Sequence, residues 1–305
     1  MEAGTGASWC YSGPMSNRPY APRLRYAIIT PSHARDFERC RILVESVHRY
    51  APVGTHHYVL VERRDERLFS RLRAPRTHVV VTQEFLPWWL HQVPFRPKWW
   101  LNLKGRPSRG WIIQQIIKLS VDAITDADVC IFIDSDAFLI KPFEPSASER
   151  DGKVPLFREF LPTEHPHNTL WHAAAAKLYG LPAEPTCCTS YVTNVVTWRR
   201  GNVTKLHRRI EQTTGQGWVE SLCRLETMSE YVLYGVFCER VLGEASGHYV
   251  EDTIRTLNHW DDSPLDDEAL RALRQRLRSE HVGVMISAKS NTAVAAIRSA
   301  FDAPP

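Results

Sequence analysis

The sequence predicts an α/β fold with a mostly parallel central sheet flanked by helices. Apolar runs at 26–30, 57–62 and 78–82 are typical of buried strands, and apolar residues at helical spacing over 36–50 separate the first two. Strands that alternate with helices build parallel sheets, because a parallel pair needs a crossover connection. A further strand is expected at Val129–Ile133, where all five residues are apolar.

The later part of the chain continues the mixture of strands and helices. We expect strands at 155–160, 191–198, 248–257 and 282–287, and helices at 110–123, 204–213, 230–242 and 266–280. No linker or internal repeat divides the 305 residues, so residues 23–305 are expected to form a single domain. Residues 1–22 are rich in Gly, Ser and Pro, and we expect a flexible leader there.

The amino-acid composition limits which partners and which cellular compartment we expect. The net charge is +4, and arginine makes up 30 of the 38 basic residues. Arginine suits phosphate ligands, although a bias in genome base composition explains the count equally well. Dense basic runs interleaved with aromatic residues are missing, so no nucleic-acid partner is expected. Seven cysteines without C-x-x-C spacing predict reduced thiols. We see no signal peptide and no long apolar run, and therefore expect a cytoplasmic protein.

The strongest chemical signal is the pair Asp134 and Asp136, directly after the apolar run 129–133. Side chains alternate along a strand, so residues i and i+2 are expected on one side. At the carboxyl end of a parallel strand, they would lie in the crevice where such sheets bind ligands. Two neighbouring carboxylates repel each other unless a cation lies between them, and hard oxygen ligands suit Mn²⁺ or Mg²⁺. A solvated Asp-rich turn is the alternative.

Two further motifs accompany the acidic pair. The sequence GWxxQQxxKL, with variable residues written x, occupies 110–119, and SEYxxYG occupies 229–235. Together with the strand that ends in D-x-D, they resemble the GT-A glycosyltransferases, in particular a bacterial glycosyltransferase-like group, over about residues 25–290. The resemblance implies a GT-A-like, Rossmann-like fold. It also implies metal-dependent transfer of a hexose, such as GlcNAc, from a UDP-sugar to a hydroxyl or amine, and we expect inversion.

The resemblance also implies roles for individual residues. Asp136 would be the main metal ligand, and Asp134 would reach the metal or the ribose and take part in catalysis. The donor-binding residues that it implies are Thr30, Pro31, Ser32, Arg35, Arg109, Gln114, Lys118, Asp134, Ser135 and Asn194. Some have plain alternatives. Lys118 could be a solvated helix charge, Asp36 a helix cap and Asn194 the partner of a backbone group.

A third metal ligand and a general base remain to be assigned. In this fold a histidine after a late strand often binds the metal, which points to His259, with His281 as the second candidate. Inverting members use a carboxylate at a helix start as the base, which points to Glu230. Thr227-x-x-Glu230 is also a capping-box pattern, so Glu230 could serve as a cap alone.

The segment 85–101 holds four tryptophans and three prolines. A buried core plug, a loop that borders the acceptor side of the cleft, and a membrane-interface contact all fit this composition. The acceptor could be a natural-product intermediate or a molecule bound to an acidic carrier protein.

Two other functions remain open. A sugar-nucleotide nucleotidyltransferase would carry a Gly-rich loop after the first strand, and residues 31–35 contain no glycine. A non-catalytic nucleotide-sugar-binding protein would not need two carboxylates aimed at one point.

Overall fold

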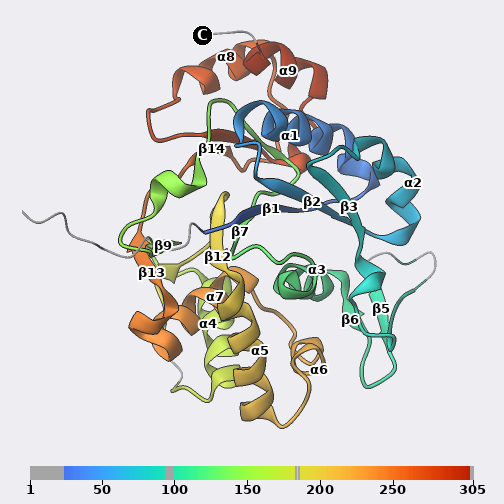
Figure 1. The fold of residues 1–305 in the computed structure, drawn as a ribbon, viewed down its shortest axis with the longest axis vertical. Coiled ribbons are helices and arrows are strands. Elements are labelled where there is room, and N and C mark those ends of the chain that lie inside the picture. Colours follow the sequence, from blue (N-terminus) through green and yellow to red (C-terminus); the bar gives the residue numbers. More distant parts are fainter. Residues whose placement is uncertain (1–23, 94–95, 97–98, 183, 185, 303–305) are drawn as a thin grey trace, which may run out of the picture.

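A computed structural model of the chain describes residues 24–93, 96, 99–182, 184 and 186–302. The expected leader at 1–22 therefore lies outside the described residues, as do Pro94, Phe95, Pro97 and Lys98 of the tryptophan-rich segment. The chain forms a mixed α/β structure around a central sheet that is mostly parallel, as the sequence predicts (Figure 1).

The central sheet has five strands in the order β12-β7-β1-β2-β3. Its members are β1 (Tyr26–Pro31), β2 (His56–Val61), β3 (Thr77–Val81), β7 (Val129–Phe132) and β12 (Val196–Arg199). Three of the four neighbouring pairs are parallel, and only β12 runs antiparallel, against β7. All four residues of β7 are buried, which explains their unbroken apolar sequence.

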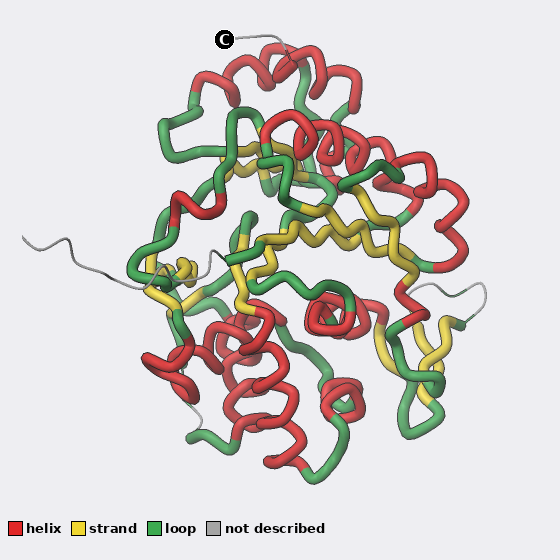
Figure 2. The backbone as a smooth tube through the Cα atoms, in the orientation of Figure 1, coloured by secondary structure: helices red, strands yellow, loops and turns green. Residues whose placement is uncertain are grey.

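Helices cover both faces of this sheet (Figures 1 and 2). On one face lie α1 (Phe37–Tyr50) and α2 (Glu66–Phe69), with α8 (Asp267–Gln275) and α9 (Val294–Asp302) beyond α1. The opposite face carries α3 (Gly110–Leu119), α4 (Pro166–Tyr179), α5 (Arg200–Thr214), α6 (Trp218–Cys223) and α7 (Glu230–Val236). The larger core cluster belongs to this second face.

Short strands form the remaining sheets. A meander of β4 (Leu90–Gln92), β5 (Trp99–Asn102) and β6 (Ser108–Arg109) leads into α3. A three-stranded sheet has the order β14-β15-β8, from β14 (Thr256–His259), β15 (Gly283–Ile286) and β8 (Ala137–Leu139). There are also two-stranded sheets among the described residues. One pairs β9 (Val154–Phe157) with β13 (His248–Glu251), and another pairs β10 (Glu159–Phe160) with β11 (Thr189–Ser190).

Several sequence expectations need correction. The strand expected at 191–198 begins only at Val196, because Val195 has φ 62°, which no extended strand allows. The strand expected at 248–257 is two strands, β13 and β14, in different sheets. The helix expected at 266–280 ends at Gln275. Helix α4 lacks a clear apolar stripe because Asn168 and His172 are among its buried residues, and the sequence pattern did not reveal it.

The six cysteines among the described residues are all free thiols, as the spacing predicts. None of the described helices combines the length and apolar character that a transmembrane span requires.

Candidate functional site

The acidic pair lies in a turn at the carboxyl end of β7. Ala137 N donates to Asp134 O at 3.0 Å, which closes a four-residue turn over 134–137. The argument from strand alternation is therefore wrong, because neither aspartate belongs to a strand. The position at the edge of the sheet is nevertheless the one expected. The two carboxylates remain close enough for the charge of Asp134 to raise the pKa of Asp136.

Asp136 is held by the loop that follows β15. Its Oδ2 accepts from Ala288 N at 3.1 Å, and its carbonyl accepts from Ile286 N at 3.1 Å. Burial, and secondly the charge of Asp134, raise its pKa to about 6, against the opposing effect of the Ala288 hydrogen bond. Burial makes the ionised form of this carboxyl group costly, and a bound cation would stabilise that ionised form. The electrostatics therefore suit a metal ligand.

Lys118 connects the acidic turn to α7. Its Nζ lies 2.9 Å from Asp134 Oδ1 and 2.9 Å from Glu230 Oε1, and it donates to Tyr231 Oη at 2.8 Å. Burial opposes the charge, but Asp134 and Glu230 outweigh that effect and hold the pKa of Lys118 well above its usual value. Lys118 is not the solvated helix charge that the sequence allowed, because its side chain is only 10% exposed.

Glu230 has a contact that the sequence did not reveal. It begins α7, and its N–H donates to Gln115 Oε1 at 3.2 Å, while the N-terminal cap is Ser229, whose hydroxyl accepts from Val232 N. The Glu230 side chain is 4% exposed and paired with Lys118. In this arrangement the Glu230 carboxylate is held by Lys118 and is almost closed to solvent. Glu230 is therefore the counter-ion of Lys118 here, and its role as the general base stays a prediction.

The carboxyl end of β1 lies beside the turn. Ser135 Oγ donates to Asp36 Oδ2 at 3.4 Å, and His33 Nε2 lies 3.3 Å from the same oxygen. Asp36 occupies the N-cap position of α1, as the helix-cap alternative expects, but its side chain makes no cap hydrogen bond. Thr30 is fully buried, and its hydroxyl donates to Ile133 O at 2.8 Å and contacts His57 Nε2. Its side chain is closed to a nucleotide.

The other donor-binding candidates at this edge differ in access. Pro31 and Ser32 are half-buried at the end of β1, and Arg35 is exposed just before α1. Asn194 is buried and donates to Asn258 Oδ1 at 3.4 Å. Strand β12 begins two residues after Asn194 and pairs antiparallel with β7, which ends two residues before Asp134.

Strain accompanies Asn194. The next residue, Val195, is β-branched and has φ 62°, a conformation that costs on the order of 1–3 kcal/mol. Its side chain is buried in the core cluster beside Ile133. Backbone strain of this kind gathers at functional sites, so the start of β12 stays a candidate part of the site.

The predicted set of three metal ligands is not assembled. Among the described residues, no three His, Cys, Asp or Glu side chains are grouped to hold a metal ion. The ring of His259 contacts Ser263 O at 3.2 Å, and its strand β14 is separated from Asp136 by β15. His281 Nδ1 accepts from Arg278 N at 3.1 Å. The turn itself offers two carboxylates, and a third, that of Asp36, lies against Ser135 and helps to raise the pKa of Asp136.

A cavity of about 450 Å³ lies on the α3 side of the sheet edge. Its lining residues are Glu62, Trp99, Trp100, Arg109, Gly110, Trp111, Ile113, Gln114 and Ile117. Glu62 directly follows β2, and Gln114 lies one helical turn before Lys118. The cavity therefore brings two expected donor-binding residues, Arg109 and Gln114, together with tryptophans expected on the acceptor side.

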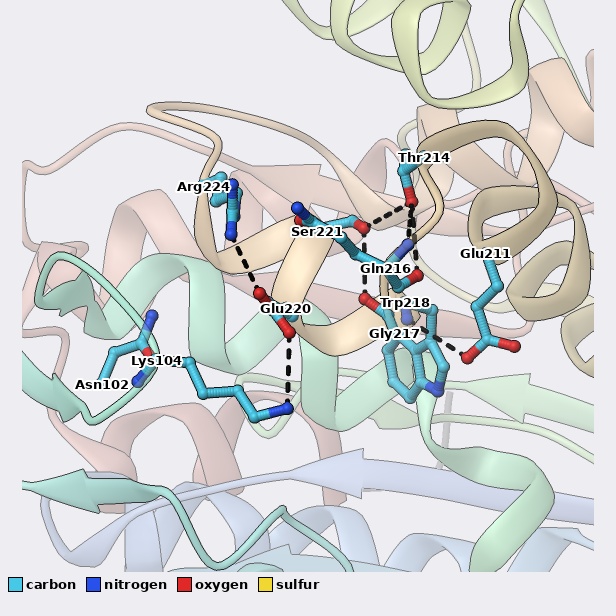
Figure 3. Close-up of polar contacts among 10 residues, drawn as sticks. All are labelled: Asn102, Lys104, Glu211, Thr214, Gln216, Gly217, Trp218, Glu220, Ser221 and Arg224. Atoms are coloured by element: carbon cyan, nitrogen blue, oxygen red, sulfur yellow. Dashed lines mark hydrogen bonds and ion pairs between the residues drawn. The ribbon is translucent and has the colours of Figure 1, made fainter.

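The meander that carries these tryptophans is anchored to α6 (Figure 3). Lys104 Nζ lies 3.4 Å from Glu220 Oε2, and Arg224 donates to the other oxygen of Glu220 at 2.9 Å. Asn102 Oδ1 accepts from Lys104 N at 2.9 Å and shapes the turn after β5. Trp89 and Trp100 are buried, whereas Trp88 and Trp99 are exposed. The segment is thus partly core and partly surface.

Comparison with known proteins gives a family. The model of a family of unknown function, DUF6492, matches residues 26–301. The chain belongs to that family. No curated protein matches the sequence.

Sequence reasoning missed three parts of the site. Arg39 on α1 is buried and donates to Ile286 O and Thr292 O, both at 2.9 Å, and so fixes the loop that holds Asp136. Tyr231 lies in the SEYxxYG motif, but the motif does not reveal its contact with Lys118. Glu62 carried no signal beyond its place after a strand. Arg39 and Tyr231 contact partners far away in the sequence, whereas Glu62 pairs with its neighbour Arg64 and accepts from Gln92.

Proposed function

We propose that this DUF6492 member is a GT-A-like, divalent-metal-dependent glycosyltransferase. It moves a hexose such as GlcNAc from a UDP-sugar to a hydroxyl or amine. The observation that carries the proposal is the turn 134–137, which presents two coupled carboxylates at the carboxyl edge of a parallel sheet. Lys118 lies at the same point, and the cavity along α3 is large enough for a ligand of this class.

The residues at the turn fit a hard divalent cation. Asp134 and Asp136 offer oxygen ligands, and Mn²⁺ or Mg²⁺ in such sites completes its shell with phosphate and water. When bound, the cation would neutralise charge on the diphosphate leaving group. The protein contributes orientation: Ala288 N holds the carboxyl of Asp136, and Lys118 holds that of Asp134. Asp36 contacts Ser135 of the turn, and Ser32 follows β1 at its carboxyl end; these two residues would meet a nucleoside.

A thermal-unfolding screen of UDP-, GDP- and dTDP-sugars with and without Mn²⁺ tests the proposal. A UDP-sugar with Mn²⁺ should stabilise the protein, by about 2.7 kcal/mol at a donor concentration 100 times the dissociation constant. Asp136→Asn should lose this stabilisation and the transfer activity. The matched control Asp252→Asn changes an exposed aspartate and should keep both. Metal-independent binding, or full activity of Asp136→Asn, would refute the proposal.

A non-catalytic nucleotide-sugar-binding protein is the second candidate. The burial of Glu230 favours it, because the carboxylate expected to act as base is occupied by Lys118. Incubation of the protein with a stabilising UDP-sugar and an acceptor library, followed by mass spectrometry, separates the two candidates. A glycosylated product supports the transferase, and metal-dependent binding without any product supports the binding protein.

A further inference from the structure

One region of the molecule concentrates exposed apolar side chains. Five of the eleven large apolar side chains that are exposed in the described residues fall within 88–111. They are Trp88 (77% exposed), Trp99, Leu101, Leu103 and Trp111, and we call them the meander face. Scattered single apolar residues are normal on a protein surface, but a cluster in one segment marks an interaction surface.

The geometry of β5 explains why these residues face outward. Along β5, Trp99 and Leu101 are exposed, while Trp100 and Asn102 between and after them are buried. Trp99 pairs with Arg109 on β6, so a basic side chain stands beside the outward indole. The inward side of the meander packs into the main core through Leu90 and Trp100. The outward side therefore has no further element of the described chain to cover it.

The same segment is strongly basic. Residues 88–111 contain five Lys or Arg and no Asp or Glu, whereas the whole chain carries a net charge of only +4. Three of these residues, Arg96, Arg106 and Arg109, are exposed and form no ion pair within the described part of the chain. An apolar surface rimmed by unpaired cations has charge complementary to an anionic bilayer.

Two contacts attach this region to the rest of the fold. Lys104 is tied to Glu220, as Figure 3 shows, and Trp111 Nε1 donates to Met228 O at 3.0 Å. Figure 1 shows β5 and β6 at the periphery of the molecule, below the central sheet and away from α8 and α9.

We infer that the meander face docks the protein on the surface of anionic lipid bilayers. Tryptophan and leucine would enter the headgroup region, and the arginines would lie at the phosphate level. The protein would rest on the membrane, not span it. This inference does not depend on the metal site, although Trp99, Trp111 and Arg109 also line the cavity beside α3.

Co-sedimentation of the full-length protein with phospholipid vesicles tests the inference. Vesicles of phosphatidylcholine with about a third phosphatidylglycerol should bind the protein, and pure phosphatidylcholine should bind it at least about tenfold more weakly. Raising NaCl from 0.1 M to 1 M shortens the screening length from about 10 Å to about 3 Å and should weaken binding.

Two sets of variants separate the apolar and basic contributions. The triple variant Trp88→Ser, Leu101→Ser, Leu103→Ser should bind anionic vesicles at least about tenfold more weakly. Its control is Phe160→Ser, Leu170→Ser, Ile254→Ser, which removes exposed apolar side chains elsewhere. Arg96→Gln and Arg106→Gln should each weaken binding about fivefold. The controls are Arg271→Gln, on the exposed side of α8, and Arg276→Gln, just after α8. Neither control should weaken binding.

Three results would overturn the inference. One is equal binding to neutral and anionic vesicles, and a second is a triple variant that binds as the parent does. The third is a self-association, seen by analytical ultracentrifugation, that the triple variant abolishes while vesicle binding is absent. That result would make the meander face a contact between two copies of the chain.

Discussion

Asp136 links the charge of the candidate site to the pH dependence of stability. Its pKa is about 6 in the native state, raised by burial and by Asp134, and about 3.9 in an unfolded chain. Between these values the native state binds more protons, so the stability it contributes is complete below about pH 4 and is lost as pH rises through 6. Asp136→Asn keeps an oxygen for Ala288 N–H and removes the charge.

We therefore expect Asp136→Asn to raise the free energy of unfolding at pH 7.5 in EDTA, by up to about 3 kcal/mol. Near pH 4 the variant and the parent should be equally stable. Guanidinium denaturation at both pH values measures the effect, and the exposed Asp252→Asn should change neither. A variant less stable than the parent at pH 7.5 would show that the charge of Asp136 is already compensated.

The contact of Lys118 with Glu230 predicts strong coupling between the two residues. Lys118→Met strands the buried carboxylate of Glu230, which should cost about 3–5 kcal/mol. Adding Glu230→Gln removes the stranded charge, so the double variant should be more stable than Lys118→Met alone. A double-mutant cycle by urea denaturation measures the coupling.

The exposed pair Lys104 and Glu220, shown in Figure 3, is the matched control for this cycle. Lys104 is 48% exposed, so its coupling to Glu220 should stay below about 1 kcal/mol. Equal coupling energies in the two cycles would contradict a dominant role for the buried ion pair.

At the scale of elements, the SEYxxYG motif makes a packing prediction. A Cβ atom on Gly235 in α7 would lie 2.3 Å from the ring of Tyr191, far inside van der Waals contact. Gly235→Ala should therefore cost about 1–3 kcal/mol, although alanine favours helices over glycine by about 1 kcal/mol. Gly201 in α5 has open space around its Cβ position, so Gly201→Ala should be neutral or stabilising.

Thermal unfolding of both variants measures the contrast. Removing the ring with Tyr191→Ala makes room for the methyl group. Gly235→Ala should therefore cost less in the Tyr191→Ala background than in the parent. A stabilising Gly235→Ala would show that Tyr191 is free to move aside.

The same scale shows what a sequence can reveal. Strands β1, β2, β3 and β7 and helices α1 and α3 follow from apolar runs and helical spacing to within a few residues, because burial leaves a local pattern. The strands of the meander do not follow from the sequence in this way, because prolines and turn residues interrupt their alternation of buried and exposed residues. The contact of Glu230 with Lys118 does not follow from the sequence pattern either. Its partner Lys118 is 112 residues away, and no local pattern reports a long-range ion pair.

At the scale of the whole molecule, the order of the sheet predicts a hierarchy of local stability. Strand β7 is buried at all four residues and is paired on both sides, with β1 and β12. Strand β10 has two residues and one partner, and its Phe160 is 72% exposed. Amides of β7 can exchange only when the sheet opens, whereas those of β10 need only a local opening.

Hydrogen exchange followed by mass spectrometry should therefore find Val129–Phe132 protected at least about 10³-fold more than Glu159–Phe160. The same experiment with Mn²⁺ and a stabilising UDP-sugar should add protection at the turn 134–137 and at the loop with Ala288, because both hold Asp136. Added protection confined to the meander would place the ligand away from the acidic turn and contradict the proposed site. Exchange in β7 as fast as in β10 would show that the central sheet is not the last part of the molecule to open.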